Sequence, residues 1–321
     1  MSPATEDSIL LWESAGGPVP LERALLILSG LETDEEVSAH EGRIDAIFLR
    51  FLEKSGLRTH LSPIRPPPYL HVDIARRLFE YLWTSKPRRF GEPFLLAEVV
   101  DAQLDPDGSR PVGTCVGLTS LYSVLALRAG LSLSLMVSSD HLLNRLRMGD
   151  RFIDLDHTDP LGFDCRSGEG FRELPLWTIT ASVLNSRGLR NERLGRFEAA
   201  LLDYDRAIGV HPEYANAFNN RGNMRALRGD LDGALGDYGE AIRLNTGFSE
   251  AYCNRGMTRQ RLGDGEGARR DYLRALALEP ACDDARRCLD SLARVREIAP
   301  TDTRNAETEA AASEPNGPLQ R

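Results

Sequence analysis

The chain has 321 residues, of which 41% are hydrophobic and 27% are charged, and its formal net charge is −9. The composition is ordinary for a globular protein, and the length suffices for about two domains. The acidic excess argues against general affinity for nucleic acid or for an anionic membrane, because both would repel this protein.

The cysteines are the first guide to compartment and cofactors. Five cysteines are scattered along the chain without a Cys-x-x-Cys pair. This pattern predicts reduced thiols, no metal site and no cofactor. The acidic start lacks the basic region and apolar core of a signal peptide, and no apolar run reaches the ~18–20 residues of a membrane helix. We therefore expect a soluble, cytoplasmic protein.

The N-terminal part is predicted to be helical. Apolar residues recur at spacings of three and four in residues 21–55 and 71–84, and Pro20 suits a helix start. A group of basic residues nearby is expected to face solvent, as charged side chains usually do. This group consists of Arg76, Arg77, Lys86, Arg88 and Arg89.

Residues 111–156 are the most informative stretch about chemistry. Cys115 opens an apolar segment, 115–128, which is predicted to be a buried helix that ends near Gly130. A cysteine in the first turn of a helix lies beside unpaired backbone N–H groups, which favour the thiolate and can stabilise an oxyanion. Residues 131–137 and 151–156 are predicted strands, and His141 follows the first of them.

These residues follow the order of a nucleophilic triad. Cys115 would be the nucleophile, His141 the base, and an aspartate would orient the imidazole. Asp156 and Asp154 both qualify for the third position, because residues two apart in a strand point to the same face.

Plain structural interpretations compete with the triad. Free cysteine is among the most buried residue types, and a lone histidine at a strand end often only packs. His157 is an alternative base, although it follows the strand that would carry the acid, and Gln103 is an upstream amide that could donate to an oxyanion.

One motif resembles a known family. The segment Phe152-Ile-Asp-Leu-Asp-His-Thr, with a small-x-Cys helix start and a histidine at a strand edge, resembles the transglutaminase-like superfamily and its usual Trp-Val-Asp-Leu-Asp-Pro-Thr. The short Cys-to-His spacing is similar to the bacterial SirB1-type branch, in which such a domain precedes tetratricopeptide repeats. Many members of that branch lack the cysteine that this chain has. Over residues 20–165 the resemblance implies a papain-like α+β fold with the triad Cys115, His141 and Asp156.

From residue 179 the sequence becomes periodic. Arg-Gly pairs ending at Gly188, Gly222 and Gly256 recur every 34 residues, as do Asp-Tyr pairs that begin at 203, 237 and 271. This period resembles the tetratricopeptide repeat, with units at about 181–214, 215–248 and 249–282. A capping helix follows to residue 297, and the tail, 298–321, is predicted to be disordered.

The expected architecture is therefore a transglutaminase-like α+β domain, residues 1–178, followed by an all-α superhelix of repeats, residues 179–297. In such arrays the first helices line a concave groove, where arginine and asparagine suit a peptide carboxylate or an acidic segment. The polar residues expected there are Asn185, Arg193, Asn219, Asn223, Gln260 and Arg261. Each of these has the competing interpretation of a solvated side chain.

Two functions remain open at this stage. The first is a cysteine acyl-transfer or amide-hydrolysing enzyme whose repeats bind a protein or peptide partner. The second is a scaffold that keeps the fold, has an idle triad and acts through the repeats alone. The substrate is not encoded in any motif, because specificity would depend on loops around the cleft.

Overall fold

The structure is a computed structural model that describes residues 20–57, 66–86, 89–106, 110–138, 141–168 and 170–298, without side chains for 294–298. The predicted tail, 298–321, lies outside these ranges except for its first residue. The chain divides into two compact units, Met1–Arg228 and Gly229–Arg321.

Helices form the N-terminal part of the first unit. They are α2 (Leu21–Leu28), α3 (Asp34–Ser55), α4 (His71–Ser85, preceded by the 3-10 turn η3, Pro68–Leu70) and α5 (Leu96–Leu104). The region 21–55 is two helices because the backbone turns at Gly30, whose φ is +88°. Thr33 starts α3 with a capping box: its side chain accepts from the N–H of Glu36, whose carboxylate accepts from the N–H of Thr33.

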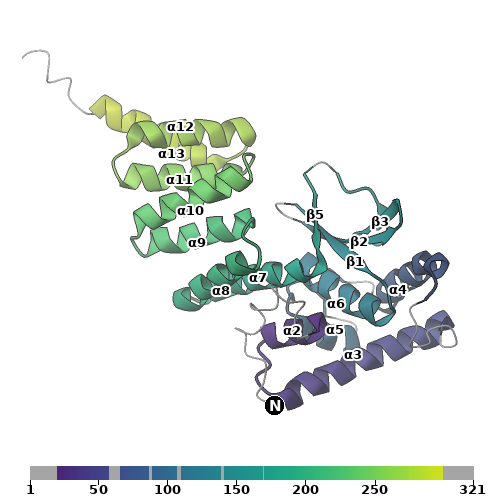
Figure 1. The fold of residues 1–321 in the computed structure, drawn as a ribbon. Coiled ribbons are helices and arrows are strands. Elements are labelled where there is room, and N and C mark those ends of the chain that lie inside the picture. Colours follow the sequence, from purple (N-terminus) through teal and green to yellow (C-terminus); the bar gives the residue numbers. More distant parts are fainter. Residues whose placement is uncertain are drawn as a thin grey trace, which may run out of the picture. The chain divides into compact units, whose positions relative to one another are not determined.

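A buried helix and an antiparallel sheet follow (Figure 1). Helix α6 (Cys115–Arg128) has the predicted bounds and packs against α4, α5, β1 and β2. The sheet has the order β4-β3-β2-β1-β5, and every neighbouring pair is antiparallel. Its strands are β1 (Leu133–Val137), β2 (Leu142–Met148), β3 (Arg151–Leu155), β4 (Phe163–Cys165) and β5 (Arg172–Pro175).

The core of the first unit continues into the first repeat. After the short turn η4 (Leu176–Thr178), helix α7 (Ile179–Arg193) contacts α2 and α6. Ile179, Val183 and Leu184 are buried in the same apolar cluster as the helices beneath the sheet. The predicted domain boundary at 178/179 thus falls inside this unit, and the division after Arg228 falls inside the second predicted repeat.

The remaining helices are α8 (Phe197–Val210), α9 (Ala215–Leu227), α10 (Leu231–Leu244), α11 (Ser249–Arg261), α12 (Gly265–Leu278) and α13 (Asp283–Ile298). Within each unit the helices of a repeat pack as a pair, α7 against α8 and α11 against α12. A Cβ on Gly188 would lie 2.5 Å from the ring of Tyr204, and a Cβ on Gly256 would lie 2.6 Å from the ring of Tyr272. The 34-residue period therefore marks positions where two helices approach too closely for any side chain.

The prediction that the basic group near α4 faces solvent is wrong for two members. Arg89 is only 2% exposed, and its Nη1 donates to the carbonyl of Leu82 (2.6 Å) and to Oε1 of Gln103 (3.1 Å). Lys86 is also buried and donates to the carbonyl of Asp105. The last carbonyls of α4 have no helical partner, and a buried cation satisfies one of them. Arg88 lies outside the described residues.

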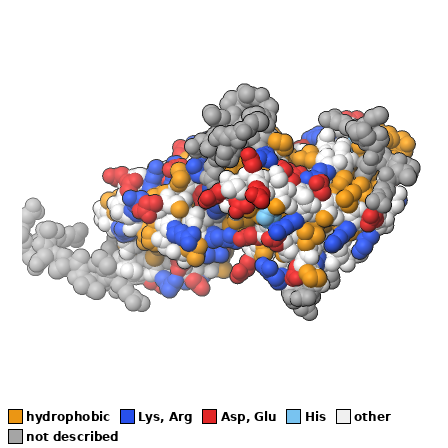
Figure 2. Space-filling view, turned by 90° about the horizontal axis from the view of Figure 1, so that it is seen from below, with side chains coloured by type: hydrophobic (Ala, Val, Ile, Leu, Met, Phe, Trp, Pro, Cys, Tyr) orange, Lys and Arg blue, Asp and Glu red, His pale blue; other side chains and the backbone are white. Residues whose placement is uncertain are grey.

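The surface has mixed charge. On the face shown in Figure 2, the described acidic and basic side chains are interspersed. Within the described ranges, no helix is both long enough and apolar enough to cross a membrane.

Candidate functional site

Cys115 is the first residue of α6. The turn that leads into this helix explains why a glycine occupies position 113. Thr114 caps the helix, because its hydroxyl accepts from the N–H of Gly117 at 3.4 Å. The N–H of Thr114 donates to the carbonyl of Pro93 at 2.7 Å. A Cβ on Gly113 would lie 2.8 Å from that carbonyl oxygen, so only glycine fits the turn that presents Cys115.

The helix start leaves backbone donors open. No hydrogen-bond partner of the N–H groups of Cys115 and Val116 is found within the described part of the chain. Both groups belong to the first turn, where the partial positive charge of the helix dipole concentrates. An anion next to Cys115 would be stabilised there.

His141 and Asp156 meet at the edge of the sheet. His141 directly precedes β2 and is fixed by Ser138, whose hydroxyl accepts from the N–H of His141 at 3.0 Å. Asp156 directly follows β3, and its Oδ1 accepts from the N–H (2.9 Å) and the hydroxyl (2.6 Å) of Thr158. Its Oδ2 is 2.9 Å from Nε2 of His141. The adjacent strands therefore place a carboxylate on one ring nitrogen and leave Nδ1 for another partner.

The surroundings of His141 and Asp156 favour a cationic imidazole and an anionic carboxylate. Hydrogen bonds with Asp156 and then with Cys115 raise the pKa of His141 to about 10, although burial acts in the other direction. Burial alone would raise the pKa of Asp156, but hydrogen bonds from His141 and Thr158 outweigh it and lower the pKa to about 2. At neutral pH the imidazole is therefore cationic, with the Asp156 carboxylate bonded to Nε2 and with Cys115 lining the same cavity.

Asp154, the alternative third residue, has a different environment from Asp156. Its carboxylate accepts hydrogen bonds from Nε (2.6 Å) and Nη2 (2.8 Å) of Arg145 and from the hydroxyl of Ser167 (2.6 Å). The strand register shifts between Asp154 and Leu155, and β3 ends there. Asp154 and Asp156 therefore do not share one face of the strand as predicted. Of the two, only Asp156 contacts His141.

His157 and Gln103 also lie away from Cys115. His157 is buried, stacks on Tyr122 with ring centroids 4.3 Å apart, and places Nε2 2.9 Å from Oδ1 of Asn144. Burial, followed by the charge of Arg89, lowers the pKa of His157 to about 3. The amide of Gln103 donates to Ser85 at 2.9 Å and accepts from Arg89. Neither lines the cavity described next, and within the described residues no cluster of acids, histidines and cysteines could hold a metal ion.

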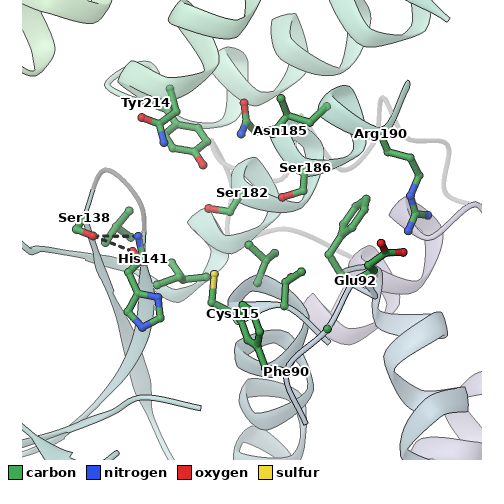
Figure 3. A pocket seen from close by; sticks show the side chains of 18 of the residues that line it. Phe90, Glu92, Cys115, Ser138, His141, Ser182, Asn185, Ser186, Arg190 and Tyr214 are labelled. Atoms are coloured by element: carbon green, nitrogen blue, oxygen red, sulfur yellow. Dashed lines mark hydrogen bonds between the residues drawn. The ribbon is translucent and has the colours of Figure 1, made fainter. Parts of the chain in front are cut away.

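A cavity of about 780 Å³ opens over Cys115 and His141 (Figure 3). Phe90 and Val137 contribute apolar surface from the segment before α6 and from β1. The opposite wall is formed by the first repeat, through α7 and Tyr214, and by the start of α9 in the second repeat. That wall is formed by Ser182, Asn185, Ser186, Leu189, Arg190, Arg193, Leu194, Tyr214 and Asn216. Sequence reasoning missed this wall because the repeats were assigned to a separate domain.

The six residues predicted to line the groove of the repeats do not lie together in one site. Asn185 and Arg193 line the cavity, and Oδ1 of Asn185 accepts from Nδ2 of Asn220 at 2.9 Å. Asn219 is 1% exposed. Gln260 accepts from the hydroxyl of Tyr272 at 2.8 Å. The other two members of the predicted set, Asn223 and Arg261, are half-buried and exposed, respectively.

Comparison with known proteins identifies the repeats. Family models of the tetratricopeptide repeat match residues 186–247 and 249–282. The first TPR of Spaghetti (RPAP3) bound to an HSP90 peptide is 27% identical, with 37% of this chain and 95% of that chain covered and a TM-score of 0.37. The second TPR domain of human RPAP3 in complex with an HSP70 peptide is 28% identical, with 36% and 93% covered and a TM-score of 0.33.

The Arabidopsis OM64 TPR domain is 23% identical, with 36% of this chain and 97% of that chain covered and a TM-score of 0.36. A search of curated proteins finds no match to this chain. The chain therefore carries tetratricopeptide repeats between residues 186 and 282.

Proposed function

We propose that this protein is a cysteine acyl-transfer or amide-hydrolysing enzyme with a transglutaminase-like domain, and that its repeats bind a protein or peptide partner. One observation carries the proposal. His141 is bonded to Asp156 through Nε2 at 2.9 Å and interacts with Cys115, and both Cys115 and His141 open into the same cavity.

The first half-reaction would acylate Cys115. A cationic His141 favours the thiolate of a neighbouring cysteine. The thiolate attacks the carbonyl carbon of an amide, a C–S bond forms, and the carbonyl π electrons move to oxygen. The N–H of Cys115, in the first turn of α6, would donate to this oxyanion. As the intermediate collapses, the C–N bond breaks and His141 gives its proton to the leaving amine.

The second half-reaction would release the acyl group. Neutral His141 takes a proton from water or from an acceptor amine, which attacks the thioester carbonyl. Breaking of the C–S bond then returns the thiolate beside a cationic His141. Asp156 keeps the imidazole in one orientation and stabilises its cationic form throughout. Water gives a carboxylic acid, and an amine gives a new amide.

The second candidate function is that of a scaffold. The family matches favour it, because they cover only the repeats, and repeat arrays bind partners without chemistry of their own. In that case the same pocket would hold a partner, and Cys115 would react as an ordinary thiol.

Alkylation kinetics separate the two functions. Iodoacetamide labelling of the Cys115 peptide is followed by mass spectrometry from pH 5 to pH 10 in the wild type and in His141→Ala. We expect the wild type to react at pH 6 and the variant to react only as the pH approaches 8.5, the ordinary range of a thiol. His40→Ala, a change in α3 away from the pocket, is the matched control. Identical alkaline profiles in all three proteins would support the scaffold.

A further inference from the structure

Two hydroxyl groups of the first repeat lie on the side of the cavity that faces Cys115. Ser182 belongs to α7, and Tyr214 immediately precedes α9. Figure 3 shows both hydroxyls between the repeat helices and the Cys115 sulfur. Both side chains line the cavity together with Cys115 and His141, and the Ser182 hydroxyl and the charge of Cys115 both act on the pKa of Tyr214. The repeat thus brings a polar pair to the reacting sulfur.

The two hydroxyls have a donor to spare. They carry two O–H groups, and a hydrogen bond between them would use only one. The described residues provide no other partner for either side-chain oxygen. Burial, the largest effect, raises the pKa of Tyr214, so the phenol stays protonated and can donate. Tyr214 is half-buried and lines the cavity, so a ligand atom there can accept a hydrogen bond from its O–H.

The repeat architecture does not require the tyrosine hydroxyl. The equivalent position in the second repeat, 34 residues later, is Phe248. Tyr214 and Phe248 have nearly the same backbone conformation: φ and ψ are −85° and 87° for Tyr214 and −79° and 83° for Phe248. Each residue precedes the first helix of the next repeat. The ring is common to both positions, whereas the hydroxyl is present only at the position that lines the cavity with Cys115.

The proposed reaction has no side-chain donor for the oxyanion among the groups described so far. A tetrahedral oxyanion is usually held by two or more donors, and those described so far are the backbone N–H groups of Cys115 and Val116. The sequence candidate for a side-chain donor, Gln103, has its amide bonded to Ser85 and Arg89 outside the cavity.

We infer that Tyr214 donates a hydrogen bond to the carbonyl oxygen of the acyl group attacked by Cys115, and that Ser182 positions the phenol. This inference rests on the proposed function and assigns the ligand as a carbonyl compound, an amide or ester of a protein or peptide. When the thiolate adds and the π electrons move to oxygen, the bond from Tyr214 strengthens without transfer of its proton. The first repeat is then part of the reaction centre and not only a partner-binding module.

The test compares a carbonyl probe with an alkylating probe. Acylation of Cys115 by p-nitrophenyl acetate passes through an oxyanion and releases p-nitrophenolate as a burst. Alkylation by iodoacetamide displaces iodide and forms no oxyanion. In Tyr214→Phe we expect the acylation rate constant to fall by about tenfold or more, as for loss of one oxyanion donor, while the alkylation rate constant stays within about twofold of wild type. Ser182→Ala should lower acylation in the same direction.

Controls make the outcome decisive. Cys115→Ser gives the background burst, and Tyr252→Phe, in α11, removes a tyrosine hydroxyl in the other unit. An acylation-to-alkylation ratio in Tyr214→Phe within about twofold of wild type would overturn the inference. So would the absence of a Cys115-dependent burst in the wild type. The first result leaves the proposed function intact, because that function is tested by the His141 dependence of alkylation, whereas the second result counts against both.

Discussion

Replacing each of the two neighbouring aspartates by asparagine should produce opposite phenotypes. Asp156→Asn removes the charge that His141 faces, whereas Asp154→Asn removes the partner of Arg145. We expect the first change to lower the reactivity of Cys115 with little loss of stability. We expect the second to lower stability with little loss of reactivity.

The magnitudes follow from burial and bonding. The side chains of Asp154 and Arg145 are 0% and 10% exposed. Breaking such a pair costs ~3–5 kcal/mol, and because Glu173 still contacts Arg145 at 3.1 Å we expect a loss of about 2–4 kcal/mol. Asp156 and His141 are 21% and 27% exposed. A charge-assisted hydrogen bond there contributes about 1.5–3 kcal/mol, so iodoacetamide labelling at pH 6 should slow by about 10- to 100-fold.

The pH dependence of the labelling rate follows from His141, whose pKa is raised to about 10 mainly by Asp156. Without that charge the imidazole loses its proton at lower pH, and the thiolate of Cys115 loses its cation. Labelling rates of Asp156→Asn and wild type should therefore differ at pH 6 and converge at pH 10. Urea unfolding followed by circular dichroism gives the stabilities. Slow labelling in Asp154→Asn with normal labelling in Asp156→Asn would refute the assignment and make Asp154 the orienting residue.

Two further predictions concern packing and acid stability. Gly188→Ala should destabilise the protein by about 1–3 kcal/mol, because its Cβ would lie 2.5 Å from the buried ring of Tyr204. Gly209→Ala in α8 has open space and should stabilise by about 0.5–1 kcal/mol; equal effects in thermal unfolding would contradict the packing argument. His157, with its pKa lowered to about 3, stays neutral in the fold and protonates when unfolded. The stability that the fold gains by keeping His157 neutral is fully present above pH ~6.5 and is lost as the pH falls towards 3. His157→Gln should reduce the slope of stability against pH between 6 and 4 by up to ~1.4 kcal/mol per pH unit, and an unchanged slope in urea titrations would contradict this.

The local features were predictable from the sequence. The helix over 115–128 is confirmed residue for residue by α6, because its apolar run and the glycine that follows Ala129 are local signals. The repeats were predictable because the close contact of Gly188 with Tyr204 recurs at a fixed spacing. The pairing of His141 with Asp156 followed from the order of the motif and the adjacency of two strands, and its catalytic role stays a prediction.

Other features depend on contacts that a one-dimensional pattern does not record. Strand β2 carries Asn144 and Arg145, which read as polar surface but are buried because Ser123 and Asp154 bond to them. The stretch between the Asp156 motif and the repeats is rich in polar residues and glycine and has no strand pattern, yet it contains β4 and the start of β5. Tyr214 occupies a position that is Phe248 in the next repeat, so its hydroxyl carried no signal until the fold placed it on the cavity with Cys115.

The apolar face of α7 bears on how this architecture can change during evolution. Ile179, Val183 and Leu184 complete the interior beneath the sheet, so a lineage that deleted the first repeat would also expose the interior of its neighbour. The part after Arg228 is a compact unit of its own, and repeats can be duplicated or lost there at much smaller cost. Variation in repeat number among related proteins should therefore concentrate at the distal end, while the first repeat is inherited together with the cysteine pocket.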